Sequence, residues 1–302
     1  MSAAQKPKAV AIVGPTASGK TSLSIALAHH FDGEIISADS RQVYCGLDIG
    51  SAKVTPDEMA GIPHHLIDVV EPTTVYTGAD FKRDGDAALS NITARGKLPI
   101  VAGGSFFYLE LLKGTMSSAP VPPNPTLRAG LEQKTTEELF ALLSSRDPKR
   151  AEVIDADNPR RLIRALEIID ALGVVPEVPQ NELSYDWLTV GIDVPVDILN
   201  ERIATRILDR LKIGMIEEVS TLHENGLSWE RLEAIGLEYR YIAYFLQNKL
   251  TKDEMIEQLT NKSRQFAKRQ RVWLKRDPSI VWLPFPAHTA TAIELVEQFL
   301  KN

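Results

Sequence analysis

The amino-acid sequence predicts an α/β protein with a parallel β-sheet core and an inserted all-helical domain. Two observations lead to this fold class. Short apolar runs alternate with helical stretches over residues 9–101, as they do in doubly wound sheets. Only helical periodicity is then visible over residues 126–172, before a strand-like run returns at residues 188–193. The helical unit is therefore expected to interrupt the α/β core.

A proline-rich stretch marks the start of the insertion. Four prolines fall within residues 117–125, which is typical of a linker between domains. We predict a core formed by residues 1–117 together with residues 186–302, and a helical domain at residues 118–185.

The composition is that of an ordinary globular protein. The chain has 302 residues, 44% of them hydrophobic and 25% charged, so it can bury a large core. A single cysteine, Cys45, excludes a disulfide framework. Because neither an apolar leader nor a run of about 18 apolar residues is present, we expect a cytoplasmic protein without a membrane partner. The net charge of −6 argues against indiscriminate nucleic-acid binding but allows a local basic surface.

The most specific motif follows the first predicted strand. Residues 14–21 match G-x-x-x-x-G-K-[ST], between a buried strand at residues 9–13 and a helix at residues 22–30. This is a phosphate-binding loop, so the core is predicted to be a P-loop NTPase-like parallel sheet. The residues expected to bind a di- or triphosphate are Gly14, Pro15, Thr16, Ala17, Ser18, Gly19, Lys20 and Thr21.

The residue types of this loop suit an anion. Gly14 and Gly19 allow the backbone to turn so that its N–H groups converge, and the following helix adds the positive end of its dipole. Lys20 supplies a positive charge for the terminal phosphate, and the hydroxyl of Thr21 is placed to ligate Mg²⁺.

A second predicted strand, residues 33–37, ends at a polar segment. Ligands of open α/β sheets lie at the carboxyl ends of the strands, so Asp39 is expected to face the phosphate loop. Its position is compatible with a Mg²⁺ ligand, a general base or a helix N-cap. Arg41 and Gln42 carry donors that recognise phosphate or a base edge, and a solvated turn is an equal alternative.

The region between this segment and the linker mixes loop, helix and strand. The expected elements are a loop at residues 53–77, a helix at residues 78–95 and a buried strand at residues 98–101 that leads to Gly103-Gly104-Ser105. His64 and His65 are adjacent and lack a third ligand at metal spacing. We therefore expect packing or capping roles for them rather than zinc binding.

After the insertion the sheet pattern returns. The expected elements are a strand at residues 188–193, a long amphipathic helix at residues 199–222, a helix from residue 251 toward residue 276, a strand at residues 279–283 and a helix at residues 291–300. Thr251 and Glu254 form a capping box that opens the second of these helices. Two apolar runs, residues 35–39 and 190–193, could each end in a Walker-B aspartate, and neither is decisive.

Two basic clusters stand out on this acidic chain. The first lies in the helical insertion and comprises Arg146, Lys149, Arg150, Arg160, Arg161 and Arg164. The second comprises Lys262, Arg264, Lys268, Arg269, Arg271, Lys275 and Arg276. Phe266 and Trp273 are interleaved with the second cluster, which contains no acidic residue. A solvated helix face would mix charges, so we favour a polyanion surface, and with the phosphate loop this suggests a small phosphorylated substrate and a nucleic acid.

At this point the sequence resembles a known family, the tRNA dimethylallyltransferases, also called tRNA isopentenyltransferases. The resemblance spans nearly the whole chain. It is carried by residues 14–21, Asp39-Ser40-Arg41-Gln42-Val43-Tyr44, Pro63-His64-His65-Leu66-Ile67-Asp68, Gly103-Gly104-Ser105 with Tyr108, residues 158–167, and Lys268-Arg269-Gln270 with Trp273. Two departures occur. Ser105 stands where the family usually has threonine and keeps the hydroxyl, while Phe106-Phe107 replaces a Gly-Leu pair and is expected to narrow the neighbouring channel.

The resemblance implies transfer of a dimethylallyl group from dimethylallyl diphosphate to the exocyclic amine of adenosine 37, beside the anticodon, in tRNAs that read codons beginning with U. The phosphate loop would hold the diphosphate with Mg²⁺ on Thr21, while Lys20 and Arg206 would stabilise its charge as it leaves. Asp39 would accept the proton of the amine. Because a stacked adenine is unreachable, the base would be flipped into a channel between the two domains.

The resemblance also implies which residues contact the tRNA anticodon stem-loop. They are Asp39, Ser40, Arg41, Gln42, Ser105, Arg128, Arg160, Arg161, Leu162, Ile163 and Arg164, and the second basic cluster would add phosphate contacts. A monomer is expected. Two alternatives stay open: an adenylate isopentenyltransferase that uses free nucleotide, and a small-molecule P-loop kinase with Asp193 or Asp39 as its Walker-B residue. An RNA-binding module without catalysis would leave Lys20 and Asp39 unexplained.

Overall fold

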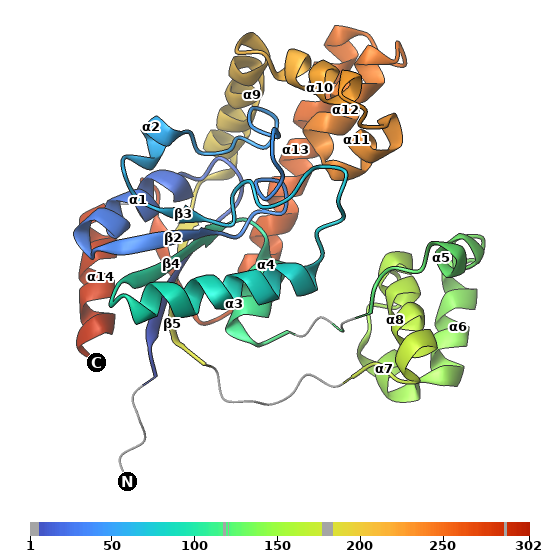
Figure 1. The fold of residues 1–302 in the computed structure, drawn as a ribbon, viewed down its shortest axis with the longest axis horizontal. Helices are drawn as coiled ribbons and strands as arrows, with labels where there is room; N and C mark the ends of the chain where they lie inside the picture. The colour runs from blue at the N-terminus through green and yellow to red at the C-terminus, as the bar shows by residue number, and fades with distance from the viewer. Residues whose placement is uncertain (1–5, 117–118, 120, 177–183, 287–288) are drawn as a thin grey trace. The chain divides into compact units, whose positions relative to one another are not determined.

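The computed structural model of the chain describes all residues except 1–5, 117–118, 120, 177–183 and 287–288 (Figure 1). The chain divides into two compact units. The larger unit comprises Met1–Gly114 and Leu183–Asn302, and the smaller unit comprises Thr115–Glu182. The proline-rich stretch at residues 117–125 lies partly outside the described residues.

A six-stranded sheet forms the centre of the larger unit. Its strands are β1 (Lys8–Val13), β2 (Gly33–Ser37), β3 (His64–His65), β4 (Leu98–Gly103), β5 (Asp186–Asp193) and β6 (Ile280–Pro284), in the order β3-β2-β4-β1-β5-β6. All neighbouring strands are parallel. Ala9 to Ile12 of the central strand β1 are fully buried, as expected for a strand covered on both faces. The predicted parallel α/β core is confirmed.

Two groups of helices cover the sheet (Figure 1). Helix α1 (Lys20–His30) packs with α14 (Thr289–Lys301), and α3 (Gly78–Ala94) packs with α4 (Phe106–Lys113). The chain crosses the sheet in one direction from β1 to β2 and returns in the other from β3 to β4. Because such crossovers are right-handed, α1 and α3 lie on opposite faces of the sheet.

Further helices follow β5. They are α9 (Val196–Lys212), α10 (Met215–Glu224), α11 (Trp229–Ile235), α12 (Leu237–Leu246) and α13 (Lys252–Leu274). The expectation of one long helix at residues 199–222 is wrong. The chain turns at Gly214, whose φ of 107° is a left-handed conformation that suits glycine, and the buried apolar stripe continues beyond the break. The predicted capping box of Thr251 and Glu254 is confirmed at the start of α13.

The region expected as a loop at residues 53–77 contains two short elements, α2 (Pro56–Met59) and β3. Strand β3 pairs with β2 and forms one edge of the sheet. The adjacent histidines of β3 take separate partners, since His65 Nε2 lies 2.7 Å from Glu34 Oε2 and His64 Nδ1 lies 2.8 Å from the carbonyl oxygen of Ile62. Across the described part of the chain, no group of three or more His, Cys, Asp or Glu side chains could hold a metal.

Within its described residues, the regular secondary structure of the smaller unit is entirely helical. Its helices are α5 (Pro125–Leu131), α6 (Thr136–Arg146), α7 (Pro148–Val153) and α8 (Pro159–Leu172). They enclose their own core, formed by Leu131, Leu139, Leu143, Leu162, Ile163, Ala165, Leu166 and Ile169. The leucine and isoleucine spacing that predicts helices in this region therefore also identifies their buried faces.

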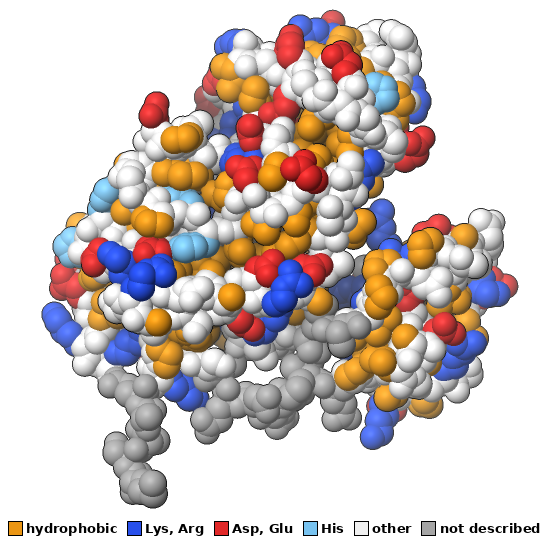
Figure 2. Space-filling view, viewed as in Figure 1, with side chains coloured by type: hydrophobic (Ala, Val, Ile, Leu, Met, Phe, Trp, Pro, Cys, Tyr) orange, Lys and Arg blue, Asp and Glu red, His pale blue; other side chains and the backbone are white. Residues whose placement is uncertain are grey.

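Charged side chains are spread over the surface of the larger unit. On the face drawn in Figure 2, acidic and basic groups are interspersed with apolar and uncharged ones. Within the described ranges, no helix combines the length and the apolar character needed to cross a membrane.

Candidate active site

Four strand ends assemble the predicted site. Strands β2, β4, β1 and β5 are parallel neighbours, so their carboxyl ends lie at one edge of the sheet. Strand β1 leads into the phosphate loop, β2 toward Asp39, β4 toward Ser105, and β5 ends at Asp193. The connection that leaves β1 leads to β2, toward one end of the strand order, whereas the connection that leaves β4 leads to β5, toward the other end. α/β proteins bind ligands at the switch point between two such neighbouring strands.

The phosphate loop has the backbone of an anion site. Ala17 and Gly19 adopt positive φ angles of 62° and 96°, and α1 begins directly after Gly19 without a side chain that caps its N-terminus. The N–H groups of the first turn are therefore available to an anion. The Ser18 hydroxyl is buried and has no hydrogen-bond partner among the described residues.

Lys20 folds back over the loop. Its Nζ donates to the carbonyl oxygens of Gly14 at 3.0 Å and Pro15 at 2.8 Å. Burial and the positive charge of Arg206 lower the pKa of Lys20 to about 8, while the Asp39 carboxylate acts in the opposite direction. An anion in the loop would stabilise the charged form of this ammonium group.

Asp39 is fixed by its own turn. Its Oδ1 accepts a hydrogen bond from the backbone N–H of Arg41 at 2.8 Å, and the residue is partly exposed. Arg206, on α9, interacts electrostatically with both Asp39 and Lys20. Desolvation and the neighbouring Arg210 lower the pKa of Arg206, but an arginine remains protonated in proteins. The predicted catalytic residues thus lie within electrostatic reach of one another.

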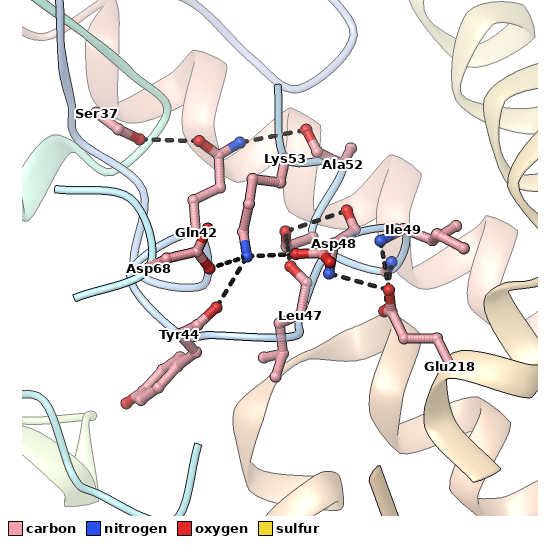
Figure 3. A network of polar contacts seen from close by, with 12 residues as sticks. Ser37, Gln42, Tyr44, Leu47, Asp48, Ile49, Ala52, Lys53, Asp68 and Glu218 are labelled. Carbon is pink, nitrogen blue, oxygen red and sulfur yellow. Dashed lines mark hydrogen bonds and ion pairs between the residues drawn. The ribbon is translucent and has the colours of Figure 1, made fainter. Parts of the chain in front are cut away.

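Gln42 is held inside the loop that follows Asp39 (Figure 3). The Ser37 hydroxyl donates to Gln42 Oε1 at 2.9 Å, and Gln42 Nε2 donates to the carbonyl oxygen of Ala52 at 3.2 Å. Both ends of the amide therefore have partners within the protein, and Gln42 fixes the shape of this loop.

Glu218 of α10 anchors the same loop to the C-terminal helices (Figure 3). Its Oε2 accepts from the backbone N–H groups of Asp48 at 2.9 Å and Ile49 at 2.6 Å, and its Oε1 from that of Gly50 at 2.9 Å. The buried Tyr239 hydroxyl donates to Oε1 as well, at 2.9 Å. Three consecutive N–H groups around one carboxylate make a strong, charge-assisted anchor.

Ser105 and its neighbours lie beside the end of β2. The backbone N–H of Ser105 donates to the carbonyl oxygen of Ala38 at 3.3 Å, and Ser105 is the N-cap residue of α4. The ring of Phe106 lies 5.4 Å from that of Trp273 on α13. On the other side of Asp39, Arg41 Nη1 donates to the Ser40 hydroxyl at 2.8 Å.

The donor set fits a magnesium-type cation held mainly by its substrate. Thr21 is exposed in the first turn of α1, directly after Lys20. Mg²⁺ in phosphate-transfer sites takes one or two protein oxygens and completes its shell with phosphate oxygens and water. A single hydroxyl beside the phosphate loop is therefore a sufficient protein contribution.

Asp193, the other Walker-B candidate, is paired with two residues of the second basic cluster. Arg271 Nη2 donates to its Oδ1 and Lys275 Nζ to its Oδ2, each at 2.9 Å. Burial alone would raise the pKa of Asp193, but the two cations hold it below its usual value. Both carboxylate oxygens have cationic partners, which argues against metal ligation and against the kinase alternative.

Comparison with known proteins now adds to this geometry. A family model described as IPP transferase matches residues 42–277. The chain belongs to the IPP transferase family.

Curated IPP transferase relatives match over nearly their full length. The tRNA dimethylallyltransferase of Roseiflexus sp. (strain RS-1) is 41% identical over 285 residues, which cover 92% of this chain and 93% of that protein. The tRNA dimethylallyltransferase of Shouchella clausii is 41% identical over 300 residues, covering 96% of both.

Solved structures agree. The tRNA isopentenylpyrophosphate transferase of Bacillus halodurans is 34% identical with a TM-score of 0.73, over 98% of this chain and 96% of that one. A eukaryotic dimethylallyltransferase described as acting on tRNA is 27% identical with a TM-score of 0.82, over 98% of this chain and 80% of that one.

The second basic cluster of this IPP transferase contains both ion-paired and exposed side chains. Arg271 and Lys275 pair with Asp193, whereas Lys268 and Arg269 are exposed. The Arg269 guanidinium lies 5.8 Å from the centre of the Phe266 ring. Most of the second basic cluster is exposed, including Lys275, while Arg264 and Arg271 are half-buried.

Two arginines of the smaller unit that are predicted to contact RNA, Arg128 and Arg164, bind a buried carboxylate of the same unit. The fully buried Glu167 carboxylate accepts from Arg128 Nε and Nη2, each at 2.7 Å, and from Arg164 Nη1 at 3.3 Å. Burial alone would raise the pKa of Glu167, but these bonds and the Asn124 N–H lower it. Arg164 Nη2 also donates to the carbonyl oxygen of Val121 at 2.7 Å.

Residues 160–163 of α8 separate into surface and core. Arg160 and Arg161 are exposed, while Leu162 and Ile163 belong to the core of the smaller unit. The expectation of tRNA contacts from the Leu162 and Ile163 side chains is corrected accordingly, because helical geometry turns them inward.

Two residues for which the sequence predicts no role contact the phosphate loop. Gln270 Oε1 accepts from the backbone N–H of Thr16 at 2.9 Å, and Arg202 Nη1 donates to the carbonyl oxygen of Ala17 at 3.4 Å. One signal pointed to Gln270, since it belongs to the Lys268-Arg269-Gln270 run that carries the family resemblance. Nothing in the local pattern distinguishes Arg202 from other helix-surface arginines.

Proposed function

We propose that this IPP transferase transfers a dimethylallyl group from dimethylallyl diphosphate to the exocyclic amine of an adenosine in tRNA. The observation that carries the proposal is the phosphate loop at the carboxyl edge of the sheet, with Lys20, Asp39 and Arg206 within electrostatic reach of one another. The names of the tRNA dimethylallyltransferase relatives agree with it. In finer detail, the target is adenosine 37 beside the anticodon, in tRNAs that read codons beginning with U.

The chemistry is a substitution at the first carbon of the prenyl group. The bond from that carbon to the diphosphate oxygen breaks, and the diphosphate departs with the electron pair. A bond forms from the adenosine nitrogen to the same carbon, and Asp39 accepts the proton that the nitrogen loses. No water has to be activated, so a Walker-B carboxylate is not required.

The phosphate loop supplies the stabilisation of the leaving group. The backbone N–H groups at the uncapped N-terminus of α1, which begins at Lys20, bind the diphosphate oxygens. Lys20 and Arg206 offset the negative charge that grows as the bond breaks. Mg²⁺ held by Thr21 would neutralise further charge on the diphosphate.

Binding of tRNA requires a second, larger surface. We assign it to Ser105, the exposed Arg160 and Arg161, and the solvent-facing Lys268 and Arg269. Ser40, Arg41 and Gln42 shape the turn beside Asp39, and Arg128 and Arg164 hold the segments around Glu167 in place. The inserted domain at residues 118–185 contacts the anticodon stem-loop, and the target base is flipped out of its stack.

The decisive experiment offers two prenyl acceptors side by side and includes an assay of ATP consumption. Radiolabelled dimethylallyl diphosphate is incubated with Mg²⁺ and either tRNA or AMP, and ATP consumption is measured in parallel. The proposal predicts label in acid-precipitable tRNA, dependent on the divalent cation and abolished in Lys20→Ala. Label in AMP would indicate the free-nucleotide enzyme instead, and ATP turnover without prenyl transfer would indicate a kinase or ATPase.

A further inference from the structure

The amide of Gln270 joins two segments of the active site that are far apart in sequence. Its Oε1 accepts from the backbone N–H of Thr16 in the phosphate loop, and its Nε2 donates to the carbonyl oxygen of Gly104 at the end of β4, each at 2.9 Å. One side chain on α13 therefore contacts the loop assigned to the diphosphate and the strand end that leads to Ser105.

The connection continues to the proposed general base. Ser105, the residue after Gly104, donates its backbone N–H to the carbonyl oxygen of Ala38 at 3.3 Å. Asp39 follows Ala38 in the chain. A continuous path of hydrogen bonds and peptide bonds thus runs from Thr16 through Gln270 to Asp39.

The path is closely packed. A Cβ atom added to Gly104 would lie 2.5 Å from Gln270 Nε2, and one added to Gly103 would lie 2.2 Å from the carbonyl oxygen of Ala38. Real Cβ atoms do not approach other atoms so closely, so these glycines permit backbone contacts that leave little room for adjustment. A larger residue at position 104 would displace the Gln270 amide, and one at position 103 would clash with the backbone of Ala38.

The glutamine amide can make both contacts at once. Lysine and arginine donate without accepting, and an ionised glutamate accepts without donating, whereas glutamine does both. The basic neighbours Arg269 and Arg271 could not replace it, because they lack an acceptor for the Thr16 N–H. The helix around it is fixed, since Ala267 and Leu274 are buried and Arg271 pairs with Asp193.

We propose that Gln270 is a positioning residue that couples the diphosphate loop to the tRNA-facing edge of the sheet, so that each substrate changes the affinity for the other. The inference rests on the proposed function. Filling the phosphate loop sets the position of Thr16 and hence of the amide, and tRNA bound at Ser105 and Asp39 sets the position of Gly104. Such coupling is reciprocal by thermodynamic necessity.

The test measures the dissociation constant of magnesium pyrophosphate, the probe for the diphosphate site, with and without saturating unmodified tRNA. In the wild-type protein the two constants are expected to differ by about fivefold or more. In Gln270→Ala the ratio is expected to approach one. Gln270→Glu keeps the acceptor for Thr16 but loses the donor for Gly104, so it should also lose coupling while weakening pyrophosphate binding through its negative charge.

The matched control is Gln258→Glu, the same change at an exposed position of α13 outside the basic cluster. It should retain the wild-type ratio. Thermal unfolding of each variant identifies any that fail to fold, and the remaining Gln270 variant then decides. A ratio of one in the wild-type protein, or an unchanged ratio in a folded Gln270 variant, would overturn the inference. Label transfer by the wild-type protein tests the proposed function separately.

Discussion

The Glu218 carboxylate accepts the backbone N–H of Ile49 at 2.6 Å, across 169 residues of sequence. The loop held in this way starts at Asp39 and is braced through Gln42. Glu218→Ala is expected to lower kcat for tRNA prenylation by roughly tenfold or more, because small misplacements of a reacting group are costly. Pyrophosphate affinity in the absence of tRNA should change little, because the hydrogen bonds of Glu218 go to residues 48–50 and Tyr239 rather than to the phosphate loop.

The control for this prediction is Glu217→Ala, which removes an exposed carboxylate from the neighbouring position of α10. Steady-state kinetics of both variants with tRNA and calorimetry with pyrophosphate provide the comparison. Equal kcat values for the two variants would show that the anchor has no role in positioning Asp39.

The titration of Lys20 is expected to make diphosphate binding depend on pH. Its pKa in the free protein lies at about 8, so the fraction that carries a positive charge falls as the pH rises through that value. Pyrophosphate affinity should therefore decrease between pH 7 and pH 9, and Lys20→Met should bind weakly without this dependence. Calorimetric titrations across the range test it, and a flat wild-type profile would contradict the assignment.

The same shift has a consequence for stability. Because the folded-state pKa of Lys20 lies below the ordinary value of 10.5, the charged form is disfavoured by folding. The resulting cost is fully present below pH 8 and disappears as the pH rises toward 10.5. The free energy of unfolding of the wild-type protein relative to Lys20→Met should increase over that interval in denaturant titrations.

Substitution of Asp193 distinguishes the transferase from the kinase alternative. Its two cationic partners assign it to holding α13 against β5, so Asp193→Asn should leave kcat close to the wild-type value while lowering stability by about 1 kcal/mol. Denaturant unfolding and label transfer measure the two effects. Complete loss of activity at unchanged stability would identify a metal-binding Walker-B residue instead.

The exposed basic residues Lys268 and Arg269 should contribute to tRNA binding mainly through phosphate contacts. The double change to alanine is expected to weaken binding and to reduce the slope of log affinity against log salt by about 2, or about 1 for each lost contact. Filter binding at several salt concentrations gives the slope. An unchanged slope would mean that the two side chains form an ordinary solvated helix face.

Structural features that depend on residues adjacent in the chain could be predicted from the sequence. The spacing of residues 14–21 predicts the phosphate loop because strand, turn and helix start are adjacent in the chain. Asp39 is predictable because a polar residue after a parallel strand lies at the ligand edge of the sheet. The break at Gly214 escaped notice because the buried stripe continues through it, so the apolar period alone does not report the turn.

Contacts between residues that are far apart in the sequence could not be predicted from local patterns. The contact between Gln270 and Thr16 joins residues 254 positions apart, and nothing in either segment specifies the other. The arginines around Glu167 illustrate the same limit, since the composition of a basic cluster does not reveal which charges are neutralised by a buried carboxylate. Such pairings depend on the tertiary fold.

The most direct test of the central claim is mass spectrometry of the nucleosides of tRNA after incubation with dimethylallyl diphosphate and Mg²⁺. With the wild-type protein we expect adenosine 37 to carry one dimethylallyl group on its exocyclic amine. With Asp39→Ala we expect turnover to fall roughly 10²-fold or more while tRNA affinity stays nearly unchanged. Unmodified tRNA after incubation with the wild-type protein, or full turnover by Asp39→Ala, would contradict the account.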